Sequence, residues 1–254
     1  MVFANGAAPP GPWIWITRTE PGASRLAHAL TTNGYRTLKA PVLRIEPRPP
    51  KSSLRSRYDL VIVVSEQAVR WAPEPLWDRA AQVVAIGPRT AAALADAGVN
   101  SSYPTLATAE GLLDGPLRAQ LQAGQSVALV RGVGGRGVLP GALRAAGLVL
   151  DELVVYERIR RPAAEIERNA DGNLSPLEPG TIGALVASSG DGLQHALSLA
   201  PHAVDVPVLV PSRRVERLAE SLGVHQPVLC DGAGNEAVLA ALNLNLETRA
   251  LRNR

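Results

Sequence analysis

The chain has 254 residues, of which 46% are hydrophobic and only 4% aromatic, and its formal net charge is +3. This length exceeds the usual size of a single core, so we expect two domains of roughly 100–130 residues. The longest apolar runs, such as residues 60–64, are far too short to span a bilayer, and residues 1–12 lack the basic start and long apolar stretch of a secretory signal.

The first half of the chain predicts two different α/β units. Residues 15–43 read as an apolar strand ending in Arg18, a turn with Pro21, an amphipathic helix closed by Gly34, and a second strand. Residues 58–113 read as strand, helix and strand, followed by a helix that begins at Pro88 and ends at Gly98. The aromatic-poor composition favours cores of Ala, Val and Leu, which is typical of helices packed on parallel strands.

The second half repeats both units in the same order. Residues 128–156 match residues 15–43 at an offset of 113, with Arg131 and Gly147 in the places of Arg18 and Gly34. Residues 180–239 match residues 58–113, with Pro211 and Gly223 at the ends of the last helix. The chain therefore resembles a duplicated α/β structure with two sheets.

The order of the units leaves two domain arrangements. Sequential pairing would give domains at 13–115 and 125–240. Interleaved pairing would give one domain from residues 1–42 plus 163–254, a second from 50–153, and crossings at 40–50 and 153–162. Both crossings are polar and contain proline, so we choose the interleaved arrangement, with two flavodoxin-like parallel-sheet domains. The crossing strands could pair as a two-stranded antiparallel ladder, which would leave a cleft between the domains.

Candidate binding residues follow the predicted strands. In parallel sheets, ligands bind beyond the carboxyl ends of the strands, where helices begin. Residues of this kind often only cap the next helix, but several such loops converge on one edge. The candidate binding residues in these loops are Thr17, Arg18, Ser65, Thr90, Arg131, Gly134, Gly135 and Ser189.

Other ligand classes have weaker support. Gly132, Gly134 and Gly137 fit a dinucleotide fingerprint after a strand, but Asp151 and Glu152 lie only 14 and 15 residues further on, so nucleotide binding is disfavoured. The four histidines are scattered singly, which predicts no metal. Basic stretches with interleaved aromatics are missing, which argues against nucleic acid.

The basic residues bear on the kind of ligand, and the single cysteine bears on the cellular compartment. Of the 26 basic residues, 24 are Arg, whose planar fork suits an acidic ligand, although a composition bias explains most of them. Cys230 is the only cysteine, which fits a reducing cytoplasm.

The motifs taken together carry a family resemblance. TRTEPGASRLAHAL, SEQAV, VVAIGPRTAAALADAG, TAEGLL, VRGVGGRGVLPGALRAAG and VVYERIR follow one another between residues 17 and 160. In this order they resemble the uroporphyrinogen-III synthase family, and the likeness extends over about residues 13–242.

The resemblance implies an activity. Members of this family close hydroxymethylbilane, a linear tetrapyrrole with eight carboxylates, to a macrocycle with ring D inverted and with loss of water. The path implied passes through an azafulvene and a spiro intermediate, without a cofactor. The family resemblance also points to a cytoplasmic monomer that could receive its substrate from hydroxymethylbilane synthase.

The resemblance also assigns roles to residues. Tyr156 occupies the place of a family tyrosine and is the best candidate to protonate the departing hydroxyl; packing on the ladder is an equally good interpretation. Ser65, Thr90, Gly134, Gly135 and Ser189 would contact carboxylates, as would Thr17 and Arg18.

Two departures from the family pattern keep an alternative open. Val63 and Val64 replace the usual Phe and Thr, and the expected Gly-Pro-hydroxyl sequence has become Val210, Pro211 and Ser212, so that Ser212 could replace the usual hydroxyl. The alternative function is a non-catalytic two-lobed module that binds an acidic small molecule.

Overall fold

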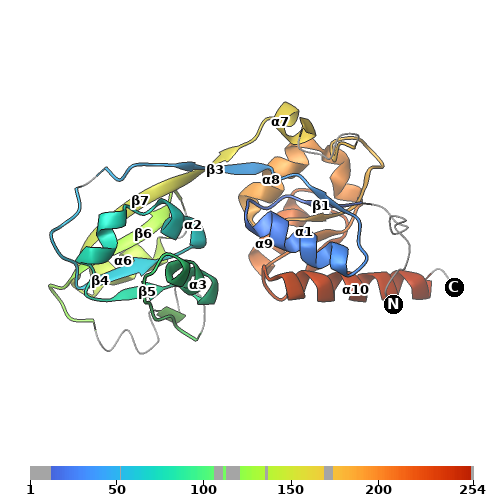
Figure 1. Cartoon of the computed structure of the whole chain (residues 1–254). Helices are drawn as coiled ribbons and strands as arrows, with labels where there is room; N and C mark the ends of the chain where they lie inside the picture. The colour runs from blue at the N-terminus through green and yellow to red at the C-terminus, as the bar shows by residue number, and fades with distance from the viewer. Residues whose placement is uncertain are drawn as a thin grey trace. The chain divides into compact units, whose positions relative to one another are not determined.

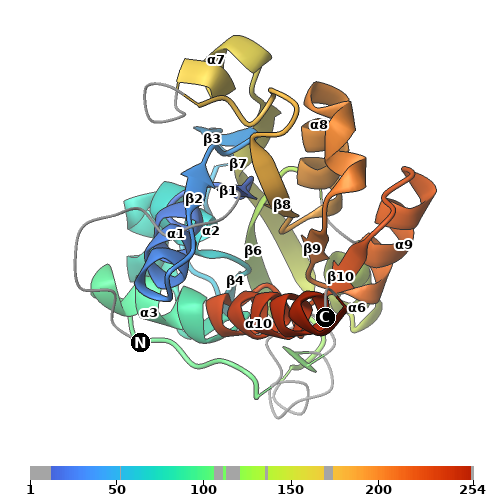
Figure 2. The ribbon, with the colours of Figure 1, turned by 90° about the vertical axis from the view of Figure 1, so that its right-hand side faces the viewer.

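The computed structural model describes residues 13–51, 53–105, 111–112, 121–134, 137–168 and 174–252. Their contacts divide the chain into two compact units, each with its own sheet (Figures 1 and 2). Unit 1 consists of Met1–Arg44 and Ile159–Arg254, and unit 2 of Ile45–Arg158. Unit 1 is therefore built from two separate stretches of sequence.

Unit 1 contains a five-stranded sheet in the order β10-β9-β8-β1-β2, and each pair of neighbouring strands described in it is parallel. Its strands are β1 (Trp13–Ile16), β2 (Thr37–Lys39), β8 (Ile182–Val186), β9 (Val208–Val210) and β10 (Pro227–Leu229). Its helices are α1 (Gly22–Thr32), α7 (Ala163–Arg168), α8 (Gly190–Leu199), η2 (Pro201–Asp205), α9 (Arg213–Ser221) and α10 (Asn235–Arg252).

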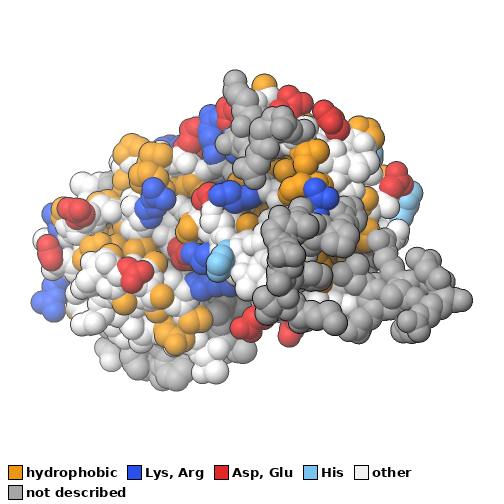
Figure 3. Space-filling model, turned by 45° about the vertical axis from the view of Figure 1, so that its right-hand side comes forward, with side chains coloured by type: hydrophobic (Ala, Val, Ile, Leu, Met, Phe, Trp, Pro, Cys, Tyr) orange, Lys and Arg blue, Asp and Glu red, His pale blue; other side chains and the backbone are white. Residues whose placement is uncertain are grey.

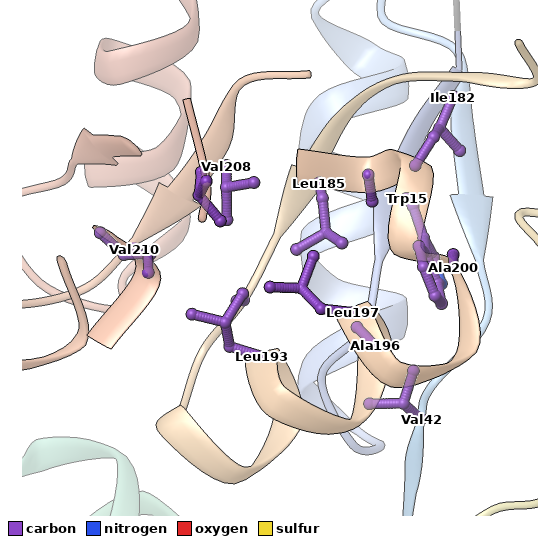
Figure 4. Close-up of a cluster of buried hydrophobic side chains, with 14 of the residues drawn as sticks. Trp15, Val42, Ile182, Leu185, Leu193, Ala196, Leu197, Ala200, Val208 and Val210 are labelled. Carbon is purple, nitrogen blue, oxygen red and sulfur yellow. The ribbon is translucent and has the colours of Figure 1, made fainter. Parts of the chain in front are cut away.

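Helices cover both faces of this sheet, because side chains alternate between the faces along each strand. Ile14 and Ile16 of β1 pack with α1 and α10, whereas Trp15 belongs to the core on the α8 and α9 side. Figure 4 shows this second core, where Leu193 and Leu197 of α8 lie against Leu185 of β8. Both faces of the sheet are therefore buried.

Unit 2 contains a second five-stranded sheet, in the order β3-β7-β6-β4-β5. Its strands are β3 (Leu43–Pro47), β4 (Leu60–Val63), β5 (Val83–Ala85), β6 (Ser126–Gly132) and β7 (Val149–Arg160). Its helices are α2 (Glu66–Trp71), η1 (Glu74–Arg79), α3 (Pro88–Asp96) and α6 (Val138–Ala145). Strand β6 pairs in parallel with β4 and β7, and β4 pairs in parallel with β5.

The sheet of unit 2 is also buried on both faces. Val61 and Val63 of β4 pack in the core that contains residues of α2 and α3. Leu60 and Ile62 point into the opposite core, together with Leu143 of α6. The continuous apolar sequence of β4 is thus explained by a strand with two covered faces.

Strands β3 and β7 connect the two units along the sequence and are neighbours in the sheet. The Arg48 N–H donates to the Val155 carbonyl at 2.8 Å, and the Arg161 N–H donates to the Val42 carbonyl at 2.9 Å. Beside them, the Arg48 guanidinium lies 3.2 Å from the Glu157 carboxylate, and that of Arg44 lies 3.0 Å from Glu165.

The prediction of an α/β fold with two mostly parallel sheets is confirmed. The repeated glycines also have the conformations expected of helix ends: φ is 83° at Gly34 and 76° at Gly147, in the left-handed region that glycine adopts most readily. Among the described residues, none of the helices combines the length and apolarity needed to cross a membrane.

Candidate active site

Parallel pairing brings the predicted residues of each unit to the carboxyl ends of its strands. In unit 1, Thr17 follows β1, Ser189 lies three residues beyond β8, and Ser212 lies two beyond β9. In unit 2, Ser65 lies two residues beyond β4 and Thr90 lies in the first turn of α3, just beyond β5. Each unit therefore gathers hydroxyl side chains at one edge of its sheet.

Tyr156 lies in unit 2, in the part of β7 that pairs with the end of β6. Its side chain belongs to the core with α2 and α3, and the residue is only 2% exposed. Its hydroxyl lies 3.1 Å from the Ser65 Oγ and accepts a hydrogen bond of 3.2 Å from the Arg158 guanidinium. The carbon of that guanidinium lies 5.4 Å from the centre of the tyrosine ring.

Gly132 lies directly beneath this ring. It is the pairing partner of Tyr156, and the register of β6 and β7 shifts by one residue between Arg131 and Gly132. A Cβ atom on Gly132 would lie 2.5 Å from the Tyr156 Cε2 atom, closer than real Cβ contacts allow. The tyrosine ring therefore occupies space that any other residue at position 132 would fill.

Ser65 has two roles in this arrangement. It is the N-cap residue of α2, and its Oγ accepts a hydrogen bond of 3.0 Å from the Ala68 N–H. The same oxygen contacts the Tyr156 hydroxyl, and either of these two groups could donate the proton. The capping interpretation of Ser65 is thus confirmed, and it leaves the Ser65 proton available.

Arg131 is engaged within the protein. Its guanidinium forms an ion pair of 3.0 Å with Glu152 on β7 and also donates to the carbonyl oxygen of Gly134. Arg144 of α6 contacts the same carboxylate at 2.5 Å. Because the Arg131 side chain is only 15% exposed, it chiefly holds the loop after β6 against β7.

The other loop residues of unit 2 are placed as follows. Thr90 is buried, with 4% of its surface exposed. Gly134 has a φ of 79°, and a Cβ added there would meet no atom within 4 Å. Gly135 lies outside the described residues.

In unit 1 the predicted residues also serve the structure. The buried Thr17 hydroxyl donates to the Val186 carbonyl at 2.8 Å, and Arg18 donates to the Ala233 carbonyl at 3.2 Å. Ser189 caps α8 by accepting from the Gly192 N–H at 3.2 Å. Ser212 is the N-cap residue of α9, but its side chain makes no capping hydrogen bond.

Sequence reasoning missed Arg158 and Gly132. A signal for Arg158 was present, because residues two apart on a strand point to the same face and Arg158 follows Tyr156 by two. Gly132 was noted only as part of a possible nucleotide fingerprint, whereas here it accommodates the tyrosine ring.

Charged side chains of both signs are interspersed on the face shown in Figure 3. Each unit contains ion pairs, such as Arg44 with Glu165 in unit 1 and Arg55 with Asp151 in unit 2. Within the described parts of the chain, His, Cys, Asp and Glu form no group of three that could hold a metal ion.

The chain has two α/β units, and one of them carries a hydrogen-bonded tyrosine, serine and arginine at the ends of its strands. This arrangement is that of an α/β enzyme. The family model for uroporphyrinogen-III synthase HemD matches residues 24–240. The chain thus belongs to the uroporphyrinogen-III synthase family, and the resemblance found in the sequence is confirmed.

Curated relatives agree over nearly their whole length. The uroporphyrinogen-III synthase of Salmonella typhimurium is 31% identical over 251 residues, covering 90% of this chain and 99% of the relative. That of Escherichia coli is 28% identical over 249 residues, with the same coverage. The chain is accordingly an enzyme of tetrapyrrole biosynthesis.

Solved structures of two distant relatives share the fold. The uroporphyrinogen-III synthetase of Helicobacter pylori superposes with a TM-score of 0.62 at 16% identity, covering 93% of this chain and 99% of the other. A mutant uroporphyrinogen III synthase of Thermus thermophilus gives a TM-score of 0.58 at 19% identity, covering 96% of this chain and all of the other.

Proposed function

We propose that this enzyme closes hydroxymethylbilane to uroporphyrinogen III, with inversion of ring D and loss of water. Family membership over most of the chain is the observation that carries this proposal. The substrate is intrinsically reactive and can close without help to the uninverted isomer I. The main task of the protein is therefore to hold the linear tetrapyrrole in one geometry, and strong chemical catalysis is the smaller part of its task.

Within this reaction, Tyr156 donates the proton that the departing hydroxyl needs. Its hydroxyl lies in hydrogen-bond contact with Ser65 and Arg158 at the strand ends of unit 2, which is where a parallel sheet presents its ligand-binding loops. The Tyr156 proton passes to the hydroxyl oxygen as the C–O bond breaks, and water leaves with the bonding pair. Attack by ring D and closure of the macrocycle release one proton, which restores the tyrosine.

The loops at the strand ends bind the substrate carboxylates. Ser65, Thr90, Gly134 and Gly135 would act in unit 2, and Thr17, Arg18, Ser189 and Ser212 in unit 1. Free N–H groups at helix starts and hydroxyl groups suit carboxylate oxygens. Ser212 is the best placed in unit 1, because its side chain is not used as a helix cap. Arg131 contributes indirectly, by holding the loop that contains Gly134.

The two units are interleaved domains joined by an antiparallel ladder of β3 and β7. Hydrogen bonds join Val42, just before β3, to Arg161, and Arg48, just after β3, to Val155. The number on the second segment falls as the number on the first rises, as antiparallel strands require. We also propose that the protein acts as a cytoplasmic monomer that receives its substrate from hydroxymethylbilane synthase.

A coupled assay tests the reaction. Hydroxymethylbilane is generated by hydroxymethylbilane synthase, this protein is added without metal or nucleotide, and the isomers are separated after oxidation to porphyrins. We expect the product to change from isomer I to isomer III. Unchanged isomer I at high protein concentration would favour the alternative, a module that binds an acidic molecule without turning it over.

A further inference from the structure

Arg158 is an exposed side chain whose guanidinium meets the oxygen of a buried tyrosine. The pleat of β7 places both residues on one face of the strand, two positions apart. The ring of Tyr156 is fixed from below by the backbone of Gly132, so its position is set by packing. What packing leaves undetermined is the direction of the phenolic proton.

The donors and acceptors around the Tyr156 oxygen limit that direction. An arginine can only donate, so the Tyr156 oxygen is the acceptor in its contact with Arg158. The Ser65 Oγ already accepts from the Ala68 N–H, and its own proton can be donated to the Tyr156 oxygen. When both neighbours donate, the tyrosine proton is free for a third group.

The charge of Arg158 acts in the same sense. Giving up its proton leaves Tyr156 as a phenolate beside a guanidinium 3.2 Å away. A neighbouring cation stabilises such an anion, and hydrogen bonds to a charged oxygen are stronger than those to a neutral one. Arg158 therefore favours the state that proton transfer creates.

We propose that Arg158 is a positioning residue for Tyr156: it orients the phenolic proton toward the substrate and stabilises the phenolate after transfer. This inference depends on the proposed role of Tyr156 as proton donor. The competing interpretation is that Arg158 binds a substrate carboxylate directly, as an exposed arginine can.

The test measures kcat and KM for isomer III formation in Arg158→Met and Arg158→Lys, each with Tyr156 and with Tyr156→Phe. Met keeps the apolar stem without the charge, and Lys restores the charge. Arg160→Met is the matched control, since Arg160 is an exposed arginine two residues further along β7.

We expect Arg158→Met to lower kcat about 10-fold with little change in KM, because the lost interaction forms fully only in the transition state. Arg158→Lys should recover part of this loss, and Arg160→Met should match the wild type. In the Tyr156→Phe background, Arg158→Met should have no further effect, because the oxygen on which it acts is gone.

Four results would overturn the inference. A raised KM with unchanged kcat would make Arg158 a carboxylate ligand, and an equal loss of kcat in both backgrounds would show that it acts without Tyr156. Wild-type kcat in Arg158→Met combined with a slow Tyr156→Phe would refute only the role of Arg158. Wild-type kcat in Tyr156→Phe would refute the proton donor itself, and the inference with it.

Discussion

At the scale of single residues, Tyr156 combines two properties that usually belong to different groups. Its ring is core, packed on Gly132 and among the side chains of unit 2, whereas its hydroxyl meets Ser65 and Arg158. A phenylalanine would keep the first property and lose the second. The two interpretations of this tyrosine, packing and proton donation, can therefore be separated by removing one oxygen atom.

Tyr156→Phe should lower kcat for isomer III roughly 10²-fold, the lower end of what a positioned general acid contributes. Its stability to urea should stay within about 1 kcal/mol of the wild type, because only one net hydrogen-bond contribution is lost. Steady-state kinetics with separation of the isomers, alongside urea unfolding, checks both. Wild-type turnover with an unchanged isomer ratio would mean that Tyr156 only packs.

At the scale of elements, two serines occupy the same N-cap position of their helices but differ in their hydrogen bonds. Ser189 and Ser212 are the N-cap residues of α8 and α9, which follow the adjacent strands β8 and β9. Only Ser189 accepts a capping hydrogen bond, from the Gly192 N–H. The two helices thus form a matched pair for measuring the value of a cap.

Ser189→Ala should destabilise the protein by about 1 kcal/mol, because an orphan N–H of the first helical turn loses its acceptor. Ser212→Ala should stay within about 0.5 kcal/mol of the wild type, the usual range away from such features. Urea unfolding of both variants gives the comparison. Equal losses would show that the stability of α8 does not depend on its capping bond.

At the scale of the whole molecule, unit 2 is a continuous stretch of chain and unit 1 is not. All five strands of the second sheet lie within residues 43–160, whereas the first sheet combines strands from both ends of the sequence. A continuous unit with its own core can in principle fold alone.

The isolated fragment 45–158 should therefore fold and give a dispersed amide NMR spectrum. Fragment 1–115 should not, because it lacks β8, β9 and β10 of the first sheet and β6, the middle strand of the second sheet. The opposite pair of spectra would favour domains that follow one another along the sequence.

The sequence was sufficient for features that depend on neighbours along the chain. The strand ends, the helix start at Ser65 and the closing glycines Gly34 and Gly147 follow from local patterns, and the ordered motifs identify the family. Contacts that depend on strand pairing could not be read. The ion pair of Arg131 with Glu152 forms only because β6 pairs with β7. The packing of the Tyr156 ring on Gly132 depends on a one-residue shift in the register of these two strands.

The pairing of β1 with β8 has a consequence for synthesis on the ribosome. Strand β1 ends at Ile16, and β8 begins only at Ile182. The other neighbour of β1, strand β2, follows within about twenty residues, but at about 5–20 residues per second β8 emerges only on the order of ten seconds or more after β1. During that time the whole of unit 2 is translated and can fold, so the nascent chain must keep its earliest strand from pairing with the wrong sheet.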